Sequence, residues 1–376
     1  MSRSLSLYLN LLRFLAAVAV YLFHAQQFAK VRFPVFGNLG DEAVIVFFVL
    51  SGLLITFAAT RQPDVAAFFR ARLARLWSVC LPALALTVLV DLVGQAIALN
   101  SYHPLQPYSA FKWVASIAIN ASFLSQVWGV NVYPGTNLPF WSLSYEFWYY
   151  MLFAACFYFK GAVRCLVVAC AALIAGPPIL IAFPVWLFGA ALFYALRRNA
   201  ISRPATGMLL WSGSIAVALA FFYFDISQIL RGALPDIASN VNRDVDFWPR
   251  SYALGMLIAA NIYGFALTGR AFLRPLERAS RVIIWGADIS FGLYVFHYPL
   301  MYFTRAVLHA AGISSGTVFV GIIYVVPFLI SAVLALVCER HKGMYSRVLA
   351  RCAVEFSKRR SGKIAEPSKT AGEQTP

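Results

Sequence analysis

The chain has 376 residues, of which 61% are apolar and only 12% are charged, and its formal net charge is +16. A soluble domain contains about 45–50% apolar and about 25% charged residues, so the composition excludes a soluble globular fold as well as collagen-like, disordered and disulfide-scaffold proteins. We expect an all-α polytopic membrane protein whose excess of Lys and Arg lies in cytoplasmic loops, with no nucleic-acid partner.

Apolar runs predict the membrane topology. A transmembrane helix needs about 20 mostly apolar residues, and such runs cover residues 10–29, 41–60, 77–98, 140–159, 207–224, 250–268, 283–304 and 317–338. A further apolar stretch, 163–196, is interrupted by Gly176, Pro177 and Pro178. Because proline disrupts a helix interior, this stretch predicts a hairpin of two shorter spans. The total is about ten transmembrane helices.

The distribution of charge in the loops supports this count. With both termini in the cytoplasm, the outer segments hold only seven of the 31 Lys and Arg residues, namely Lys30, Arg32, Lys112, Arg231, Arg243, Arg250 and Arg305. Such an asymmetry is typical of the positive-inside rule. No cleavable signal peptide is expected, because Arg13 interrupts the first apolar stretch and no small-x-small cleavage site follows it.

Three segments are less regular. Residues 111–128 carry several polar side chains, so we expect an interfacial or re-entrant helix there; a full span would give eleven helices. A second outer loop is expected near 225–249. We assign residues 1–340 to a membrane domain and 341–376 to a basic, disordered cytoplasmic tail.

The first span carries two ionisable residues, Arg13 and His24. They are eleven residues apart, which is almost three helical turns, so both side chains share one face about 16 Å apart along the axis. Arg13 is expected near the cytoplasmic end and His24 in the outer half. A charge at membrane depth is a functional hypothesis by default, although a lone buried histidine is often only structural.

Arg72 and Arg75 precede the third span on the expected cytoplasmic face. The positive-inside rule alone can explain such a pair. The functional interpretation is phosphate binding, because the guanidinium is a rigid, always-charged fork that suits phosphate oxygens.

Glu146 is the only acidic residue in the fourth expected span. An unpaired carboxylate in lipid is costly, so we expect a cationic partner, and His24 has a comparable expected depth. The alternative is a glutamate that only braces two helices.

In the ninth expected span, Ser290, Tyr294 and His297 have i, i+4, i+7 spacing and therefore lie on one helical stripe. They are candidate substrate contacts, and an interfacial Tyr/His belt is the alternative. The six cysteines form no CxxC pair, and we expect neither structural disulfides nor a bound metal.

Five ordered segments resemble the acyltransferase 3 family of integral membrane O-acyltransferases. They are Arg13-x10-His24, VFFVLSGLLI at 46–55, Phe69-x-x-Arg72-x-x-Arg75, WSLSYEFWYY at 141–150 and SFGLYVFHYPL at 290–300. The resemblance extends from residue 7 to about residue 340. One departure is that the acidic residue often found before the FF pair is replaced by Ile45, with Asp41 and Glu42 slightly earlier.

The resemblance implies a ten-helix enzyme of the bacterial plasma (inner) membrane that O-acylates sugars with a cytoplasmic acyl-CoA donor. His24 and Arg13 are then essential, and Arg72 and Arg75 lie close to the CoA. No permanently bound cofactor is implied. The partners are acyl-CoA, a carbohydrate acceptor on a surface polysaccharide or lipid-linked glycan, and the lipid bilayer.

For the mechanism we hypothesise that Glu146 orients His24, which acts as a general base or carries the acyl group covalently. Tyr294 and His297 contact the oxyanion or the acceptor. Outer aromatic residues are candidates for stacking on sugar rings, namely Tyr102, Tyr108, Trp113 and Trp128. The alternative is a proton-coupled transporter of a lipid or sugar, with His24, Glu146 and His297 as a proton relay.

Overall fold

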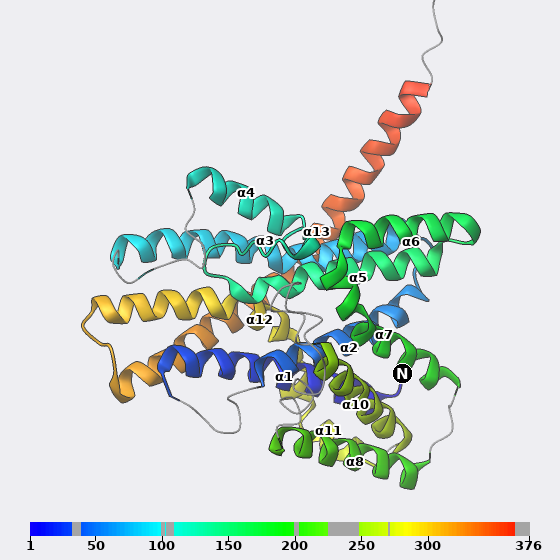
Figure 1. Ribbon diagram of the computed structural model, residues 1–376, viewed down its shortest axis with the longest axis horizontal. Helices are drawn as coiled ribbons and strands as arrows, with labels where there is room; N and C mark the ends of the chain where they lie inside the picture. The colour runs from blue at the N-terminus through cyan, green and yellow to red at the C-terminus, as the bar shows by residue number, and fades with distance from the viewer. Residues whose placement is uncertain are drawn as a thin grey trace, which may run out of the picture.

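The structure is a computed structural model (Figure 1) that describes residues 1–31, 39–98, 102, 109–198, 203–224, 248–269 and 271–364. Across these residues the only regular secondary structure is helical. The predicted all-α class is therefore confirmed.

Each predicted span corresponds to one long helix. These helices are α1 (Arg3–Ala29), α2 (Gly40–Ala59), α3 (Val65–Ile97), α5 (Trp141–Tyr158), α6 (Gly161–Ala175), α7 (Pro177–Arg198), α8 (Pro204–Tyr223), α10 (Trp248–Leu267), α12 (Ser280–Ala310) and α13 (Gly316–Ile364). Among the described residues, six helices are long and apolar enough to cross a membrane: α1, α2, α3, α7, α8 and α13. A polytopic membrane protein is thus supported, and the total of ten spans stays a prediction.

The predicted hairpin between 163 and 196 is present as α6 and α7. The two helices are separated at Gly176, whose φ of +80° is in the left-handed region that favours glycine. A Cβ atom there would also lie 2.9 Å from the backbone of Trp128. Pro177 then begins α7, a position where the missing N–H costs nothing.

Helix α12 packs against α1, α3 and α13. In Figure 1 α1, α3 and α12 run along the long axis of the molecule. Glycines permit these close contacts: a Cβ on Gly286 would overlap the ring of Phe14, and one on Gly292 would overlap Ala335. Small residues serve this purpose at helix interfaces in membranes.

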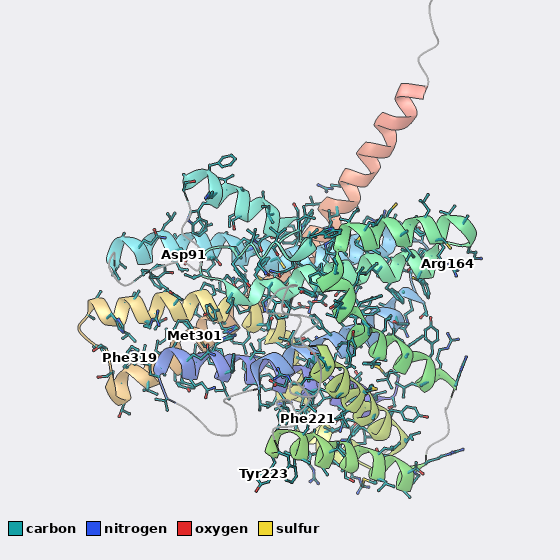
Figure 2. All side chains as sticks on the ribbon, viewed as in Figure 1. Asp91, Arg164, Phe221, Tyr223, Met301 and Phe319 are labelled. Atoms are coloured by element: carbon teal, nitrogen blue, oxygen red, sulfur yellow. The ribbon has the colours of Figure 1, made fainter. Side chains whose placement is uncertain are left out.

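The two ends of the bundle agree with the predicted sidedness. The N-terminus and Arg164 lie toward one end, whereas Asp91, Met301 and Phe319 lie toward the opposite end (Figures 1 and 2). This arrangement fits N-terminal and Lys160–Arg164 segments on one face of a membrane. Which end faces the cytoplasm stays a prediction.

The segment between α3 and α5 contains the short helices α4 (Ala110–Ala121), η1 (Val127–Gly129) and η2 (Leu138–Phe140). With 12 residues, α4 is about 18 Å long and too short to cross a hydrocarbon core of about 30 Å. This supports an interfacial or re-entrant element at 111–128. Most of the loop expected near 225–249 lies outside the described residues.

Two further features complete the bundle. A short helix, α11 (Leu273–Arg278), precedes α12. Helix α13 has 49 residues and continues to Ile364, well into the segment that we expected to be disordered. In Figure 1 its last turns project away from the other helices.

Candidate active site

A cavity of about 150 Å³ lies between α1, α2, α3, α5 and α12, and it collects most of the predicted site residues. Its polar lining consists of Arg13, Ser51, Arg72, Arg75, Ser142, Glu146, Tyr150, Ser290 and Tyr294. The helices thus bring together residues from all five sequence segments singled out above. We refer to this space as the arginine cavity.

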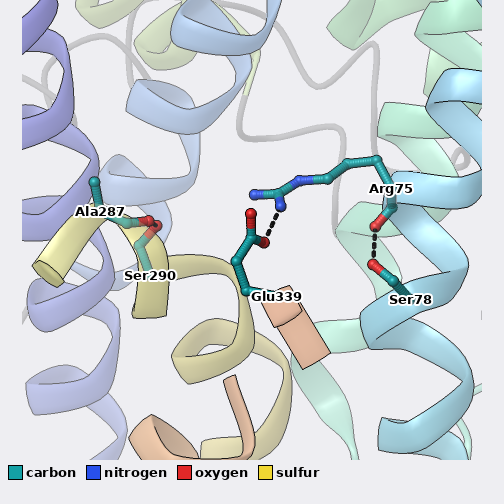
Figure 3. A network of polar contacts seen from close by, with 5 residues as sticks. All are labelled: Arg75, Ser78, Ala287, Ser290 and Glu339. Carbon is teal, nitrogen blue, oxygen red and sulfur yellow. Dashed lines mark hydrogen bonds and ion pairs between the residues drawn. The ribbon is translucent and has the colours of Figure 1, made fainter. Parts of the chain in front are cut away.

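Arg75 is engaged by a carboxylate. Its guanidinium forms an ion pair and hydrogen bond with Glu339 of α13 and lies 5.6 Å above the centre of the Phe291 ring. Figure 3 shows the Arg75 side chain reaching from α3 to Glu339, with Ser290 on the neighbouring α12. Sequence reasoning missed Glu339, because it follows the last residue of the 317–338 apolar run and resembled an ordinary tail residue.

The other two arginines are arranged differently. The Nε atom of Arg72 is buried and has no hydrogen-bond partner among the described residues. The charges that act on Arg13 are those of Arg75, Glu146, Glu339 and the exposed Asp288. The cavity therefore holds three cationic groups, and one of them has a buried donor to which no described residue is hydrogen-bonded.

Glu146 belongs to this cavity and does not pair with His24. Its Oε1 accepts hydrogen bonds from Ser51 Oγ at 3.0 Å and from the Tyr150 hydroxyl. Ser51 in turn accepts a bond from Trp186 Nε1 at 3.1 Å. The expected Glu146–His24 pair is thus corrected, because equal depth in two helices does not fix the direction of each side chain around its axis.

His24 instead stacks on His297. The ring centres are 5.2 Å apart with an interplanar angle of 30°, and the Tyr298 ring lies edge-on to His24 at 4.8 Å. His297 Nδ1 lies 2.9 Å from the Leu293 carbonyl oxygen. Because a carbonyl only accepts, this bond assigns the proton to Nδ1. We refer to His24 and His297 as the histidine pair.

Each member of the histidine pair has a buried nitrogen without a hydrogen-bond partner among the described residues. The atoms are His24 Nδ1 and His297 Nε2. A buried polar atom without a partner is costly and calls for an explanation, of which an absent ligand or water is one.

Tyr294 connects the arginine cavity with the histidine pair. Its side chain lines the cavity, its ring centre is 6.4 Å from that of His297, and its hydroxyl is hydrogen-bonded to Ser142 Oγ at 2.8 Å. Ser290 lines the cavity as well. The stripe predicted from the i, i+4, i+7 spacing therefore runs from the cavity to the pair.

A buried polar network supports α12 at the opposite end from Arg164. Asp91 of α3 is fully buried and accepts hydrogen bonds from the Tyr102 hydroxyl at 2.5 Å, and from Thr136 Oγ1 at 2.6 Å and Thr136 N at 2.9 Å. The adjacent Asn137 donates to Thr87 Oγ1 at 3.2 Å and to the Val295 carbonyl at 3.1 Å.

The Asn137 bond compensates for a proline. In an α-helix the Val295 carbonyl would accept from residue 299, but Pro299 has no N–H. A signal for this network was present in the sequence, since Asp91 is the only charged residue in the 77–98 run. The criterion that singled out Glu146 applied equally to Asp91.

The predicted sugar-stacking aromatics have mixed outcomes. Tyr102 is buried against Asp91 and does not offer a free ring face. Trp128 is 61% exposed, although its Nε1 donates to the Leu173 carbonyl at 2.8 Å. Tyr108 lies outside the described residues.

Glu42, the acidic residue before the FF pair, is engaged by a residue of another helix. It forms an ion pair with Arg250 of α10, with 3.2 Å between Oε1 and Nη2. Neither residue lines the arginine cavity. This pair links α2 to α10.

Comparison with known proteins identifies the family. The acyltransferase 3 family, described as an acyltransferase domain, matches residues 6–337. A curated relative, Acyltransferase MdmB of Streptomyces mycarofaciens, is 32% identical over 152 residues, which is 38% of this chain and 36% of the relative. The match thus spans about a third of that relative's length, and no solved structure matches the chain. Because the family match covers nearly all of the membrane domain, the chain belongs to the acyltransferase 3 family.

Proposed function

We propose that the protein is a membrane O-acyltransferase that moves an acetyl or other short acyl group from cytoplasmic acyl-CoA to a hydroxyl of a cell-surface polysaccharide or glycolipid. The observation that carries this proposal is the placement of the arginine cavity and the histidine pair on either side of Tyr294. The arginines that we assign to anion binding and the histidine that we assign as the base thus both adjoin Tyr294.

The arginine cavity is the proposed donor site. Arginine forks bind phosphate oxygens with two parallel hydrogen bonds, and CoA carries several phosphate charges. Arg72 and Arg75 lie in the first third of α3, whose N-terminal end is toward the end of the bundle that holds the N-terminus, the expected cytoplasmic end. The CoA phosphates bind Arg72, Arg75 and Arg13, and the acyl-bearing arm extends between the helices toward Tyr294.

The histidine pair is the proposed acceptor site. His24 takes the proton from the acceptor hydroxyl as its oxygen attacks the thioester carbonyl. The tetrahedral intermediate collapses, the C–S bond breaks, and the CoA thiolate regains the proton from His24. Alternatively, His24 attacks the thioester carbonyl first and the C–S bond breaks, which leaves an acyl-imidazole and the CoA thiolate. The acceptor hydroxyl then attacks the acyl-imidazole, the N–acyl bond breaks, and the hydroxyl proton passes to the freed imidazole or to the thiolate. His297 and Tyr294 contact the acceptor or the developing oxyanion.

We assign Glu146 a role other than the expected one of orienting His24. Because its carboxylate lies inside the arginine cavity and accepts from Ser51 and Tyr150, it balances part of the charge of the arginines. A proton relay from His24 through Glu146 to His297 has no support in this arrangement, since Glu146 contacts neither histidine among the interactions of the described residues. The transporter alternative is therefore not proposed.

The sidedness of the donor provides the test. Sealed inverted and right-side-out membrane vesicles from expressing cells are supplied with radiolabelled acetyl-CoA from outside, and vesicles from cells that lack the protein are the control. We expect ester-linked label in glycan only with inverted vesicles that contain the protein. Equal labelling with and without the protein would refute the proposed function, and labelling only in right-side-out vesicles would refute a cytoplasmic donor.

A further inference from the structure

The carboxylate of Glu339 is bound to the guanidinium of Arg75, one of the arginines of the proposed donor site. Its Oε2 is bound to Arg75 Nη1, and it is one of the charges that act on Arg13. The residue lies near the end of the apolar part of α13, which extends from Gly316 to His341. No described residue of α13 lines the arginine cavity, but through Glu339 this helix brings a carboxylate to Arg75, which does line it.

The Arg75–Glu339 pair is only partly screened by solvent. The side chain of Arg75 is 31% exposed and that of Glu339 is 21% exposed. Partly buried ion pairs are weakened by salt less than exposed ones. A ligand that binds Arg75 therefore has to displace Glu339 from the guanidinium.

The charges of the cavity lead to the same conclusion. Three arginines, Arg13, Arg72 and Arg75, are opposed by the carboxylates of Glu146 and Glu339. Most of the positive charge is thus balanced before any anion binds. The two carboxylates differ in one respect: Glu146 accepts hydrogen bonds from Ser51 and Tyr150, and Glu339 forms an ion pair directly with an arginine.

We propose that Glu339 competes with the phosphates of the acyl donor for Arg75 and thereby sets the affinity of the enzyme for its donor and product. A guanidinium presents the same fork to a carboxylate and to a phosphate, so the incoming phosphate displaces Glu339 from Nη1. The same competition helps CoA to leave after transfer, because Glu339 returns to Arg75. This inference rests on the proposed function, since it requires a phosphate-bearing donor.

The direction in which one substitution changes the affinity for acetyl-CoA distinguishes competition from positioning. Glu339→Gln keeps the size of the side chain and an oxygen that can accept from Arg75, but it removes the negative charge. If Glu339 competes, the variant binds acetyl-CoA more tightly. If Glu339 only holds Arg75 in a productive orientation, the variant binds acetyl-CoA equally well or more weakly.

The experiment measures the dissociation constant of acetyl-CoA for the full chain in lipid nanodiscs by isothermal titration calorimetry. We expect Glu339→Gln to lower the dissociation constant roughly five- to tenfold. The matched control is Glu277→Gln, which removes a carboxylate from an exposed ion pair with Arg3 outside the cavity. The control is expected to leave the dissociation constant unchanged.

A second variant shows whether the effect passes through Arg75. In an Arg75→Ala background, Glu339→Gln is expected to change the dissociation constant by less than about twofold, because non-additivity reports a direct interaction. An unchanged or raised dissociation constant in Glu339→Gln, with wild-type binding intact, would overturn this inference alone. Absence of acetyl-CoA binding to the wild type would overturn both the inference and the proposed donor.

Discussion

Replacing Asn137 with leucine removes the donor that satisfies a carbonyl of α12. Asn137 is fully buried, and its Nδ2 bonds to the Val295 carbonyl at 3.1 Å and to Thr87 Oγ1 at 3.2 Å. Because Pro299 offers no N–H to Val295, the carbonyl loses its side-chain partner at a point where the helix supplies none. His297 lies on the same helix, between Val295 and Pro299 and within one turn of each.

The magnitude follows from the lost partner. A buried acceptor left without a hydrogen bond costs about 1–3 kcal/mol, so we expect a loss of about 2 kcal/mol in unfolding free energy. A catalytic group displaced by about 1 Å can lose about 100-fold in rate. Relaxation of α12 around Pro299 is therefore expected to lower kcat at least tenfold, with little change in the KM for acyl-CoA, because the arginine cavity does not include Asn137.

The assay compares Asn137→Leu with Asn120→Leu in thermal unfolding and in acetyl transfer. Asn120 is equally buried, and its Nδ2 bonds to the Ser116 and Val132 carbonyls at 2.9 and 3.1 Å, away from α12. We expect similar losses of stability and a loss of kcat in Asn137→Leu alone. Equal loss of kcat in both variants would refute the link between Asn137 and the histidine pair.

Two further substitutions test the donor site and the packing. Arg72→Ala is expected to raise the KM for acyl-CoA about tenfold, equivalent to about 1.4 kcal/mol, whereas the exposed Arg61→Ala leaves it unchanged; a change confined to the acceptor KM would contradict the donor placement. Gly52→Ala is expected to lower unfolding free energy by about 1–3 kcal/mol through overpacking, because its Cβ would lie 2.0 Å from the Trp186 carbonyl oxygen. Gly213→Ala is the control in the same melting experiment, because a Cβ at that position meets no atom within 4 Å. Equal melting temperatures of Gly52→Ala and Gly213→Ala would contradict the close α2–α7 contact.

The helices were predictable because lipid imposes a strong constraint on sequence. Backbone polar groups must be satisfied inside each segment, so long apolar runs become helices, and all ten predicted segments did. The end of α6 at Gly176 was equally predictable, because a glycine followed by two prolines does not continue a helix.

The composition of the site was predictable, but its pairing was not. Charges at membrane depth identified Arg13, His24 and Glu146, and helical spacing placed Ser290 and Tyr294 on one stripe. The partner of Glu146 depended on rotation around helix axes, which a sequence does not reveal, and it is Ser51 and Tyr150 instead of His24. The partner of Arg75 is Glu339, which is 264 residues away along the chain. The partner of the Val295 carbonyl is Asn137, which is 158 residues away.

The central claim is that His24 performs the acyl transfer. The most direct measurement is the NMR signal of ester-linked acetyl groups on surface glycans from a deletion strain complemented with wild type, His24→Ala or His309→Ala. His309 is an exposed histidine at the end of α12 and serves as the control. We predict that wild type and His309→Ala restore the acetyl signal and that His24→Ala, at equal membrane levels, does not. Full restoration by His24→Ala would contradict the account.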